Sequence, residues 1–479
     1  MRHLAHPVAR TPRRPLGHAV VLGGSAVGLL AARVLSDQFD RVTLIERDAL
    51  ADRPEPRKGV PQGNHLHALL ARGRMIAEAL LPGLCDALLA AGAMRLNAGR
   101  DLAWHQSGGW RVQHDSDLFF LSMSRPLLES TIVKRVRALP NVTILDGVRV
   151  IGLRAEGNCV TGVRLAKPAG CARGSEIEAD LVVDAMGRGS SVPQWLMELG
   201  FAAPQTELVG ARVSYATWTF RRLDHEPNRR AVVVAGKPAR RSGLMFPIEG
   251  DRWLVTLPGF FDEPMPQDHN AFLAYARSLA VPDIYDVIRN GEPLSEIKRF
   301  RFIGSLRRRY ERLEHVPEGL IAMGDAVCSF NPVYGQGMTV GAIEAEALSR
   351  AVTEARVEGG IGPDFGRRWF QTIRPVVDAA WNGVRLEDFR FPELARERPL
   401  RLRPLQWYME RVQQATHRSA FVTDRFYRVM NFLEPPSAFF SPRVMAEVLL
   451  PGFGSTHRGT TTAWSHAPVC RAPQASRVG

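Results

Sequence analysis

The hydrophobic positions begin with a short apolar strand from His18 to Leu22, followed by a glycine turn, an apolar helical stretch and a second strand that ends in acids near Asp48. This order is typical of the start of a parallel α/β sheet. Later stretches return to the same core: a helix at 126–138, a strand at 142–145, a hairpin-like stretch at 148–165 and apolar runs at 181–183 and 319–323. We therefore expect a mostly parallel sheet that carries a small β-meander.

The middle of the chain has a different pattern. Residues 211–258 alternate between apolar and polar positions, and Glu249-Gly250-Asp251 separates two apolar runs as a hairpin turn does. This pattern predicts a separate antiparallel sheet. Helical periodicity follows at 338–353 and again, interrupted by prolines, across 365–450.

These patterns predict an α/β fold with several parts. A Rossmann-like domain is assembled from the separated segments 18–195 and 300–360, and an antiparallel-sheet substrate domain spans 196–299. A C-terminal helical region covers 361–451. We expect the Pro- and Arg-rich segment 1–17 to be a disordered arm and 452–479 to be a disordered tail.

Composition and charge argue against a disordered chain, a nucleic-acid partner and a membrane-spanning protein. The 479 residues are 45% hydrophobic and 23% charged, which is typical of a folded chain. The net charge of +13 would suit nucleic acid, but the expected arm and tail hold arginines without any acid, and the remaining basic residues alternate with acids. We therefore expect no nucleic-acid partner. No apolar run approaches the ~20 residues of a membrane span, so we expect no membrane insertion and a cytoplasmic location.

The glycine turn has the chemistry of a dinucleotide site. Backbone N–H groups at the start of a helix, with its positive dipole end, stabilise a pyrophosphate. Glu46 ends the second strand, where it can accept hydrogen bonds from ribose hydroxyls, and Arg47 follows it. Because the middle glycine of the usual pattern is replaced by a serine, an ordinary tight turn is the alternative. The candidate residues of the turn are Gly23, Gly24, Ser25, Ala26, Val27 and Gly28.

Two further segments make the chain recognisable. Residues 180–190 read DLVVDAMGRGS, and residues 324–326 read GDA and continue into NPVYGQGM at 331–338. With the glycine turn, and in this order, they resemble the group A FAD-dependent monooxygenase family, in particular squalene epoxidase and the bacterial polyether-antibiotic epoxidases. Residues 57–67, RKGVPQGNHLH, are similar to the same epoxidases. The resemblance extends over about residues 18–350.

The resemblance implies FAD as the cofactor. Asp325 follows a buried strand and can accept hydrogen bonds from flavin ribityl hydroxyls, while the loop after it has little bulk and can lie against a ring system. The helix after that loop can stabilise negative charge on a reduced ring. The alternatives are a capping role for Asp325 and a plain surface position for Arg125. The cofactor-binding residues implied in this way are Arg125, Arg149, Asp184, Gly187, Gly324, Asp325, Pro332, Gly335, Gly337 and Met338.

The resemblance also implies an activity. NAD(P)H would reduce FAD without a second stable nucleotide site, and one atom of O2 would pass to a lipophilic substrate by epoxidation or hydroxylation, as in secondary-metabolite or antibiotic biosynthesis. No Ser/His/Asp or Cys/His arrangement is indicated, so we assign no catalytic side chain. A reductase and a halogenase of the same fold are alternatives, although the halogenase segment Trp-x-Trp-x-Ile-Pro is absent. A non-catalytic basic binding protein is the alternative from another class.

A few other residues invite a functional interpretation. His65 and His67 have no cysteine or acid near them, which favours a structural or site-lining role over a metal site. The five cysteines form no CxxC pair and predict neither a zinc site nor a disulfide framework. For Trp218, Phe246 and Trp253 on the antiparallel strands, core packing and the wall of the substrate pocket are both open; we carry them as pocket candidates.

Overall fold

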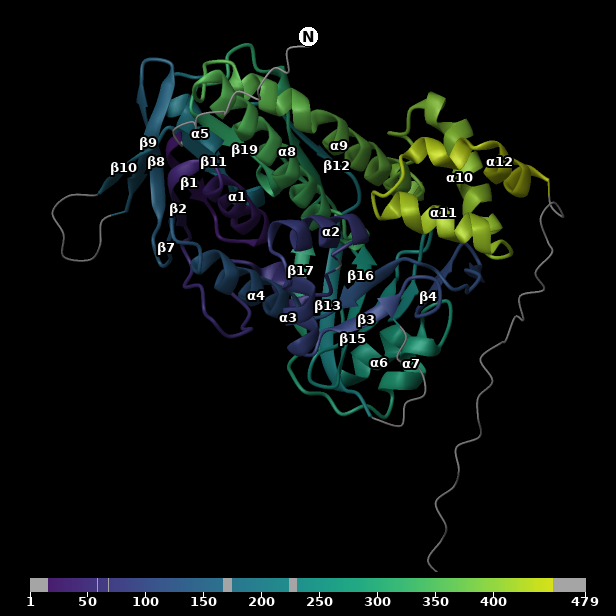
Figure 1. The fold of residues 1–479 in the computed structure, drawn as a ribbon. Coiled ribbons are helices and arrows are strands. Elements are labelled where there is room, and N and C mark those ends of the chain that lie inside the picture. Colours follow the sequence, from purple (N-terminus) through teal and green to yellow (C-terminus); the bar gives the residue numbers. More distant parts are fainter. Residues whose placement is uncertain (1–15, 58, 68, 167–174, 224–230, 451–479) are drawn as a thin grey trace, which may run out of the picture.

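The computed structural model describes residues 16–57, 59–67, 69–166, 175–223 and 231–450 (Figure 1). The predicted disordered tail lies outside these residues. So does the predicted arm, except that its last two residues, Leu16 and Gly17, already belong to the first strand.

A parallel sheet forms the centre of the first half, as predicted. Its middle strand β1 is completely buried from Ala19 to Leu22 and is paired on both sides, which explains why this strand reads as a continuous apolar run. The sheet has the order β19 (Leu320–Ala322), β11 (Leu181–Asp184), β1 (Leu16–Leu22), β2 (Phe39–Ile45), β7 (Val142–Leu145). The predicted meander is confirmed as the antiparallel strands β8 (Val150–Glu156), β9 (Cys159–Leu165) and β10 (Glu176–Glu178).

Helices cover this parallel sheet. Helix α1 (Ala26–Ser36) contacts β1, β2 and the long helix α8 (Gly337–Glu358). A Cβ on Gly341 of α8 would lie 2.3 Å from Val27 of α1, so a glycine permits the close approach of these two helices. The other helices of this half are α2 (Ala71–Leu80), α3 (Leu84–Ala90), α4 (Arg125–Arg137) and α5 (Val192–Glu198).

The predicted antiparallel sheet is present, but its boundary and composition differ from the prediction. Strand β4, at 102–106, pairs with β14 (Ala231–Val234), and β5, at 109–110, pairs with β4, so both belong to this sheet although we assigned them to the Rossmann-like domain. Strands β4 and β14 are parallel, which makes the sheet mixed. A parallel pairing between segments so far apart leaves no local sequence signal. The sheet order is β17 (Lys298–Phe302), β13 (Val213–Arg221), β16 (Arg252–Phe260), β15 (Gly243–Ile248), β14 (Ala231–Val234), β4 (Leu102–Gln106), β5 (Gly109–Trp110).

Smaller elements complete the second half. Helices α6 (His269–Arg277) and α7 (Asp283–Ile288) pack against one face of the mixed sheet around a core that includes Phe272 and Ile284. Two small sheets are formed by β12 (Thr206–Val209), β18 (Ser305–Arg308) and β20 (Cys328–Ser329), and by β3 (Met94–Asn97) and β6 (Phe119–Ser122).

The C-terminal helical region is confirmed, with one correction. Helix α9 (Phe365–Asp388) continues through Pro375, where we expected proline to interrupt it. Its apolar face, which includes the fully buried Trp369 and Trp381, outweighs the ~3 kcal/mol that a proline costs inside a helix. The chain then forms α10 (Arg403–Ala415), α11 (Ala420–Met430) and α12 (Pro442–Leu449), which lie beside the mixed sheet (Figure 1).

Among the helices of the described ranges, none is both long and apolar enough to cross a membrane.

Candidate functional site

A cavity of about 500 Å³ lies where the three sequence motifs meet. The turn after β1, the residues after β2 and the loop 332–338 all contribute to its wall, although they are far apart in the sequence. We call it the cofactor cavity. The predicted cofactor residues that line it are Gly23, Ser25, Val27, Glu46, Arg47, Arg125, Arg149, Gly187, Asp325, Pro332, Gly335, Gly337 and Met338.

The glycine turn between β1 and α1 leaves room for a phosphate. Gly23 has φ +102°, and a Cβ there would lie 2.5 Å from the Ala185 carbonyl oxygen. A Cβ on Gly28 would lie 1.9 Å from the Gly23 carbonyl oxygen. Ser25 makes no capping hydrogen bond and the first turn of α1 has no acid, so the first N–H groups of this helix are open to an anion.

Glu46 holds this turn and also lines the cavity. Its Oε2 accepts a hydrogen bond from the Gly24 N–H at 2.6 Å, and its Oε1 accepts one from the Asp48 N–H at 3.0 Å. Each carboxylate oxygen keeps a second lone pair, which a ribose hydroxyl can use. Gly24, Ala26 and Gly28 themselves lie behind the cavity wall, where they shape the turn.

The side chain of Arg125 is only 9% exposed, which excludes the plain surface position. Its Nε donates to Glu129 Oε1 at 2.8 Å, and Arg57 donates to the other oxygen of Glu129 at 2.5 Å. Burial raises the pKa of Glu129, but the charges of Arg125 and Arg57 outweigh it, so its pKa lies below the usual value. Arg149, in contrast, is exposed at the rim, and its carbonyl oxygen accepts the Ala166 N–H.

Asp325 lies in the cavity wall, three residues after the end of β19. Burial raises the pKa of its carboxyl, and the positive charge of Arg125 opposes that rise. The residue before Asp325, Gly324, has φ +62° and donates its N–H to Glu344 of α8.

Gly324 therefore shapes the loop without lining the cavity itself. Sequence reasoning missed Glu344, although an acid four residues after Val340 and four before Leu348, on the apolar face of α8, is the signal that marks it.

Asp184 supports the wall without lining the cavity. It is completely buried, accepts hydrogen bonds from Ser190 Oγ at 2.5 Å and the Met186 N–H at 3.1 Å, and burial raises its pKa to about 6. Its bonds hold the turn in which Met186 and Arg188 line the cavity, two residues that the sequence did not single out.

The loop from Pro332 to Met338 forms the floor of the cavity. Gly335 has φ +65°, and α8 begins at Gly337 without an acid in its first turn. Gln336 Oε1 is buried and has no hydrogen-bond partner among the described residues. An unpaired buried acceptor and an uncapped helix start both fit a polar, partly anionic ligand, as FAD is. FAD bound here would supply the redox and oxygen chemistry.

A second, smaller cavity of about 150 Å³ adjoins the first, and we call it the apolar cavity. Gln62, His67, Pro332 and Gly335 line both cavities. Aromatic side chains supply much of its remaining wall: Trp104, Tyr215, Phe246 and Phe300 from the mixed sheet, Phe120 from β6 and Tyr427 from α11.

Phe246 lies in the wall of the apolar cavity, as predicted, but Trp218 and Trp253 do not. Both tryptophans are buried on the opposite face of the mixed sheet, in the core that α6 and α7 cover. Successive side chains of a strand point to opposite faces, and in β13 the residues Tyr215 and Thr217 face the cavity side. Trp218 therefore points away, and core packing is the correct interpretation for both tryptophans.

His65 and His67 line the apolar cavity. Burial lowers the pKa of His65 to about 4 and, together with the nearby Arg125, lowers that of His67 to about 3. Both rings are therefore neutral near pH 7. Within the described parts of the chain, no group of three or more His, Cys, Asp or Glu side chains could hold a metal ion.

The loop between the two cavities is anchored by a buried ion pair. Asp388 of α9 accepts a hydrogen bond from the Tyr334 hydroxyl at 2.5 Å, and Lys237 Nζ lies 3.3 Å from the same carboxylate oxygen. Burial lowers the pKa of Lys237, and the charge of Asp388 opposes that change. Asp388 also accepts the Ala211 N–H at 3.1 Å, so one carboxylate ties this loop to α9 and to the start of β13.

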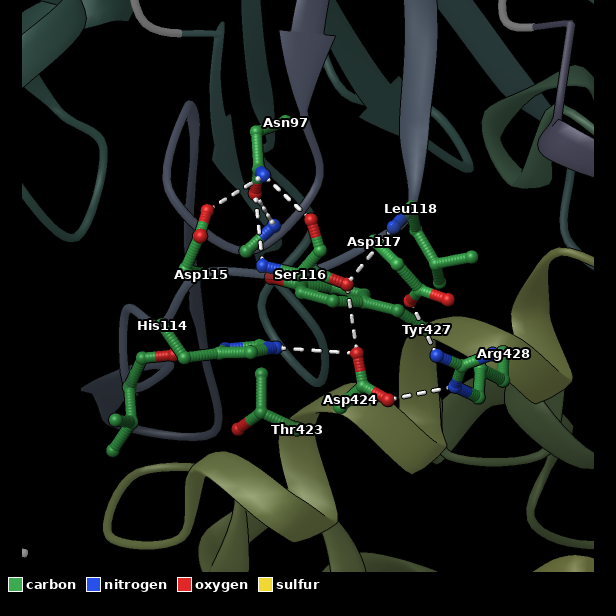
Figure 2. A network of polar contacts seen from close by, with 12 residues as sticks. Asn97, His114, Asp115, Ser116, Asp117, Leu118, Thr423, Asp424, Tyr427 and Arg428 are labelled. Carbon is green, nitrogen blue, oxygen red and sulfur yellow. Dashed lines mark hydrogen bonds and ion pairs between the residues drawn. The ribbon is translucent and has the colours of Figure 1, made fainter.

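The C-terminal wall of the apolar cavity is fastened by the polar network in Figure 2. Asp424 of α11 accepts hydrogen bonds from Ser116 Oγ at 2.8 Å and from Arg428 Nε at 2.7 Å, and its other contact is His114 Nε2 at 3.4 Å. The His114 contact is the largest cause that holds the pKa of Asp424 well below its usual range. Tyr427 of the same helix stacks on His114 and lines the cavity.

Comparison with known proteins decides the family. The sequence model of the FAD binding domain family matches residues 18–360. The chain belongs to this family. One relative and one solved structure of similar fold are named as monooxygenases. The particular similarity to squalene epoxidase and the polyether epoxidases stays a prediction.

Two relatives and one solved structure show the extent of the similarity. The chain is 36% identical over 374 residues to protein Rv3254 of Mycobacterium tuberculosis, which covers 76% of this chain and 79% of the relative. It is 27% identical over 367 residues to 6-methylpretetramide 4-monooxygenase of Streptomyces rimosus, with 72% and 78% covered. The crystal structure of pqsL, a probable FAD-dependent monooxygenase from Pseudomonas aeruginosa, shares the fold with a TM-score of 0.59 at 18% identity, over 79% of this chain and 99% of that one.

Proposed function

We propose that the cofactor cavity holds FAD and the apolar cavity a lipophilic organic substrate, which the enzyme epoxidises or hydroxylates with O2 and electrons from NAD(P)H. The observation that carries this proposal is the shared wall. Because Gln62, His67, Pro332 and Gly335 line both cavities, a ligand in one lies next to a ligand in the other. Proximity of this kind is what a direct transfer between two bound molecules requires.

The chain's own residues have three tasks in this reaction. The first turn of α1 and Glu46 bind the adenosine diphosphate half, and Asp325 accepts hydrogen bonds from the ribityl chain. The N-terminal end of α8 stabilises negative charge on the reduced ring. The aromatic wall of the apolar cavity keeps water away from the reacting atoms.

Secondary metabolism is the biological setting that we propose. One relative is named a 6-methylpretetramide 4-monooxygenase, and this name supports hydroxylation of an aromatic substrate as one outcome. Epoxidation of a double bond is the other outcome that the same site allows, and the product distinguishes them.

The binding part of the proposal is tested with Asp325→Ala. Removal of this acceptor leaves ribityl hydroxyls without a partner, so we expect FAD affinity to fall at least about tenfold. Asp40→Ala, at an exposed position of β2, is the control and should bind FAD as the native protein does. Flavin absorbance after reconstitution gives the occupancy. A native protein that stays colourless would revive the non-catalytic alternative.

The catalytic part is tested with isotopically labelled O2. NADPH oxidation and product mass are measured for a panel of lipophilic polyenes and phenols. We expect one labelled oxygen atom in the product of a turned-over substrate. Label that comes from water, or a reduced product without added oxygen, would contradict the proposal, and the latter would favour the reductase.

A further inference from the structure

Three consecutive arginines, 307–309, lie at and just after the end of β18, and the middle one differs from its neighbours. Arg307 and Arg309 both pair with Glu311 on one side of the strand. Successive side chains of a strand point to opposite faces, so Arg308 points to the other side. Arg308 is only 7% exposed and, in the described parts of the chain, forms no ion pair with a carboxylate. Its hydrogen bonds go to backbone groups instead.

Arg308 joins two turns that carry residues of the cofactor cavity. Its Nη1 donates to the Ala326 carbonyl oxygen at 2.8 Å, and its Nη2 donates to the Arg188 carbonyl oxygen at 2.7 Å. Asp325 lies in the first of these turns, and both Asp325 and Arg188 line the cavity. A Cβ on Gly187 would lie 3.8 Å from the Cβ of Asp325, so the two turns are in contact. One planar guanidinium thus fixes their separation.

The charge of Arg308 also acts on the acids of this region. Both of its hydrogen-bond partners are neutral carbonyl groups, which do not cancel its positive charge. Burial raises the pKa of Asp325, and the surrounding positive charges, Arg308 among them, oppose that rise. Burial raises the pKa of Asp184 to about 6, and Arg308 opposes that rise as well. The charged or titratable groups that interact with Asp325 are Arg125, Arg188, Arg308, Cys328 and Glu344.

We propose that Arg308 positions the cofactor from behind the cavity wall: it holds the turn of Arg188 against the turn of Asp325, and its charge keeps the Asp325 carboxylate ionised as an acceptor for ribityl hydroxyls. This inference rests on the proposed function for placing FAD in the cofactor cavity. Arg308 does not line that cavity itself, so it acts through the two residues that do. It is therefore a positioning residue.

The first measurement separates the bridge between the turns from the charge. FAD is titrated into the full-length protein from which flavin has been removed, and flavin fluorescence gives the dissociation constant. Arg308→Met removes both the bridge and the charge, so we expect the dissociation constant to rise at least about tenfold near pH 7. Arg308→Lys keeps the charge, but one ammonium group cannot reproduce the fork that reaches both carbonyl oxygens, so we expect a smaller rise.

The second measurement repeats the titration between about pH 5 and 7, a range in which Glu344, with its pKa raised to about 8 by burial, stays mostly neutral. Because the ionised carboxyl is the better acceptor, FAD affinity should fall as the pH falls through the pKa of Asp325. This fall should begin about one pH unit higher in Arg308→Met than in the native protein, and close to the native value in Arg308→Lys. A loss of packing alone would lower the affinity without moving the pH profile.

Asp325→Asn assigns the shift to one acid. This change is made in the native protein and in Arg308→Met, and the difference between their pH profiles should then disappear. A difference that persists would come from Asp184, which both proteins keep, and would contradict the role assigned to Asp325. Arg309→Met is the matched control, because its side chain pairs with Glu207 and not with the two turns; it should keep the native FAD affinity and pH profile.

Native FAD affinity in both Arg308 variants, or an unchanged pH profile in Arg308→Met, would overturn the inference. If Arg308→Met does not fold, Arg308→Lys decides, because native affinity in that variant would mean that the bridge does not position the cofactor. A native protein that binds no FAD would contradict the proposed function and this inference with it. FAD binding without incorporation of labelled O2 would contradict the proposed function alone, and unchanged variants of an FAD-binding protein would contradict this inference alone.

Discussion

The cofactor cavity and the apolar cavity share a wall, yet they are built in different ways. The cofactor cavity is shaped largely by backbone: glycines that allow close approach, helix starts that present N–H groups and strand ends that place an acid. The apolar cavity is shaped by side chains from distant strands and from α11. A cavity shaped by backbone accepts few residue types at each position, whereas a wall made of side chains accepts many. Substitutions at the two cavities should therefore differ in their effects on stability and on ligand binding.

The largest effect is expected from a side chain inside the glycine turn. Gly28→Val would place a Cβ 1.9 Å from the Gly23 carbonyl oxygen, which the backbone cannot avoid without moving. We expect loss of FAD binding and a drop of about 4 kcal/mol or more in the free energy of unfolding. Gly383→Ala is the control, because a Cβ at this exposed position of α9 meets nothing within 4 Å. Retention of FAD by Gly28→Val would show that the turn is not what shapes the cofactor cavity.

The next largest effects should differ between the two faces of the mixed sheet, one of which packs against α6 and α7 while the other lines the apolar cavity. Trp253→Ala should lower the free energy of unfolding by about 3–4 kcal/mol, because it empties a buried position under α6 and α7. Phe246→Ala, on the cavity face, should cost less stability and weaken substrate binding selectively. Urea denaturation and substrate titration of both variants check this. A larger loss of stability in Phe246→Ala than in Trp253→Ala would mean that Phe246, and not Trp253, lies in the core of the protein.

A smaller effect depends on pH and concerns Glu344, behind the cofactor cavity. Burial raises its pKa from 4.5 to about 8, so between these values the folded chain holds a proton that the unfolded chain releases. The free energy of unfolding should therefore fall as the pH rises, by up to about 1.4 kcal/mol per pH unit from this group.

Glu344→Gln should remove this part of the pH dependence, since the amide is neutral at every pH and keeps an acceptor for the Gly324 N–H. Denaturation midpoints at several pH values between 5.5 and 7.5 give the slope. Glu354→Gln, at an exposed position of the same helix, should leave the slope unchanged. An equal slope in native protein and Glu344→Gln would mean that Glu344 is ionised in the folded state.

The difference between the cavities also explains how much the sequence could predict. The glycine turn, Glu46 and the loop after Asp325 lie in short continuous motifs, so their residues could be named in advance, and they meet at one cavity. The residues behind that wall, such as Asp184, belong to the same motifs, but they support the turn and do not line the cavity. Sequence proximity to a motif does not separate lining residues from supporting ones.

The wall of the apolar cavity was less predictable because strand register decides which residues face that cavity. Trp218 and Phe246 look alike in sequence, but their positions in β13 and β15 point them to opposite faces. Tyr427 could not be found at all from local pattern, since it reaches the cavity only through the docking of α11. Long-range pairing of this kind leaves no mark in a short window of sequence.

The contacts of Asp424 hold α11 against the rest of the chain, and this has a consequence for which substitutions can change the apolar cavity. The family model ends at residue 360, whereas part of the apolar wall comes from residues 427–431. The polar network of Asp424 joins that late segment to residues 114–117 (Figure 2), and the Ala71 N–H also donates to Asn431 Oδ1 at 2.8 Å. Part of the apolar wall thus lies outside the segment that the family model covers, so substitutions at Tyr427, Met430 or Asn431 can change that wall without touching any residue that lines the cofactor cavity.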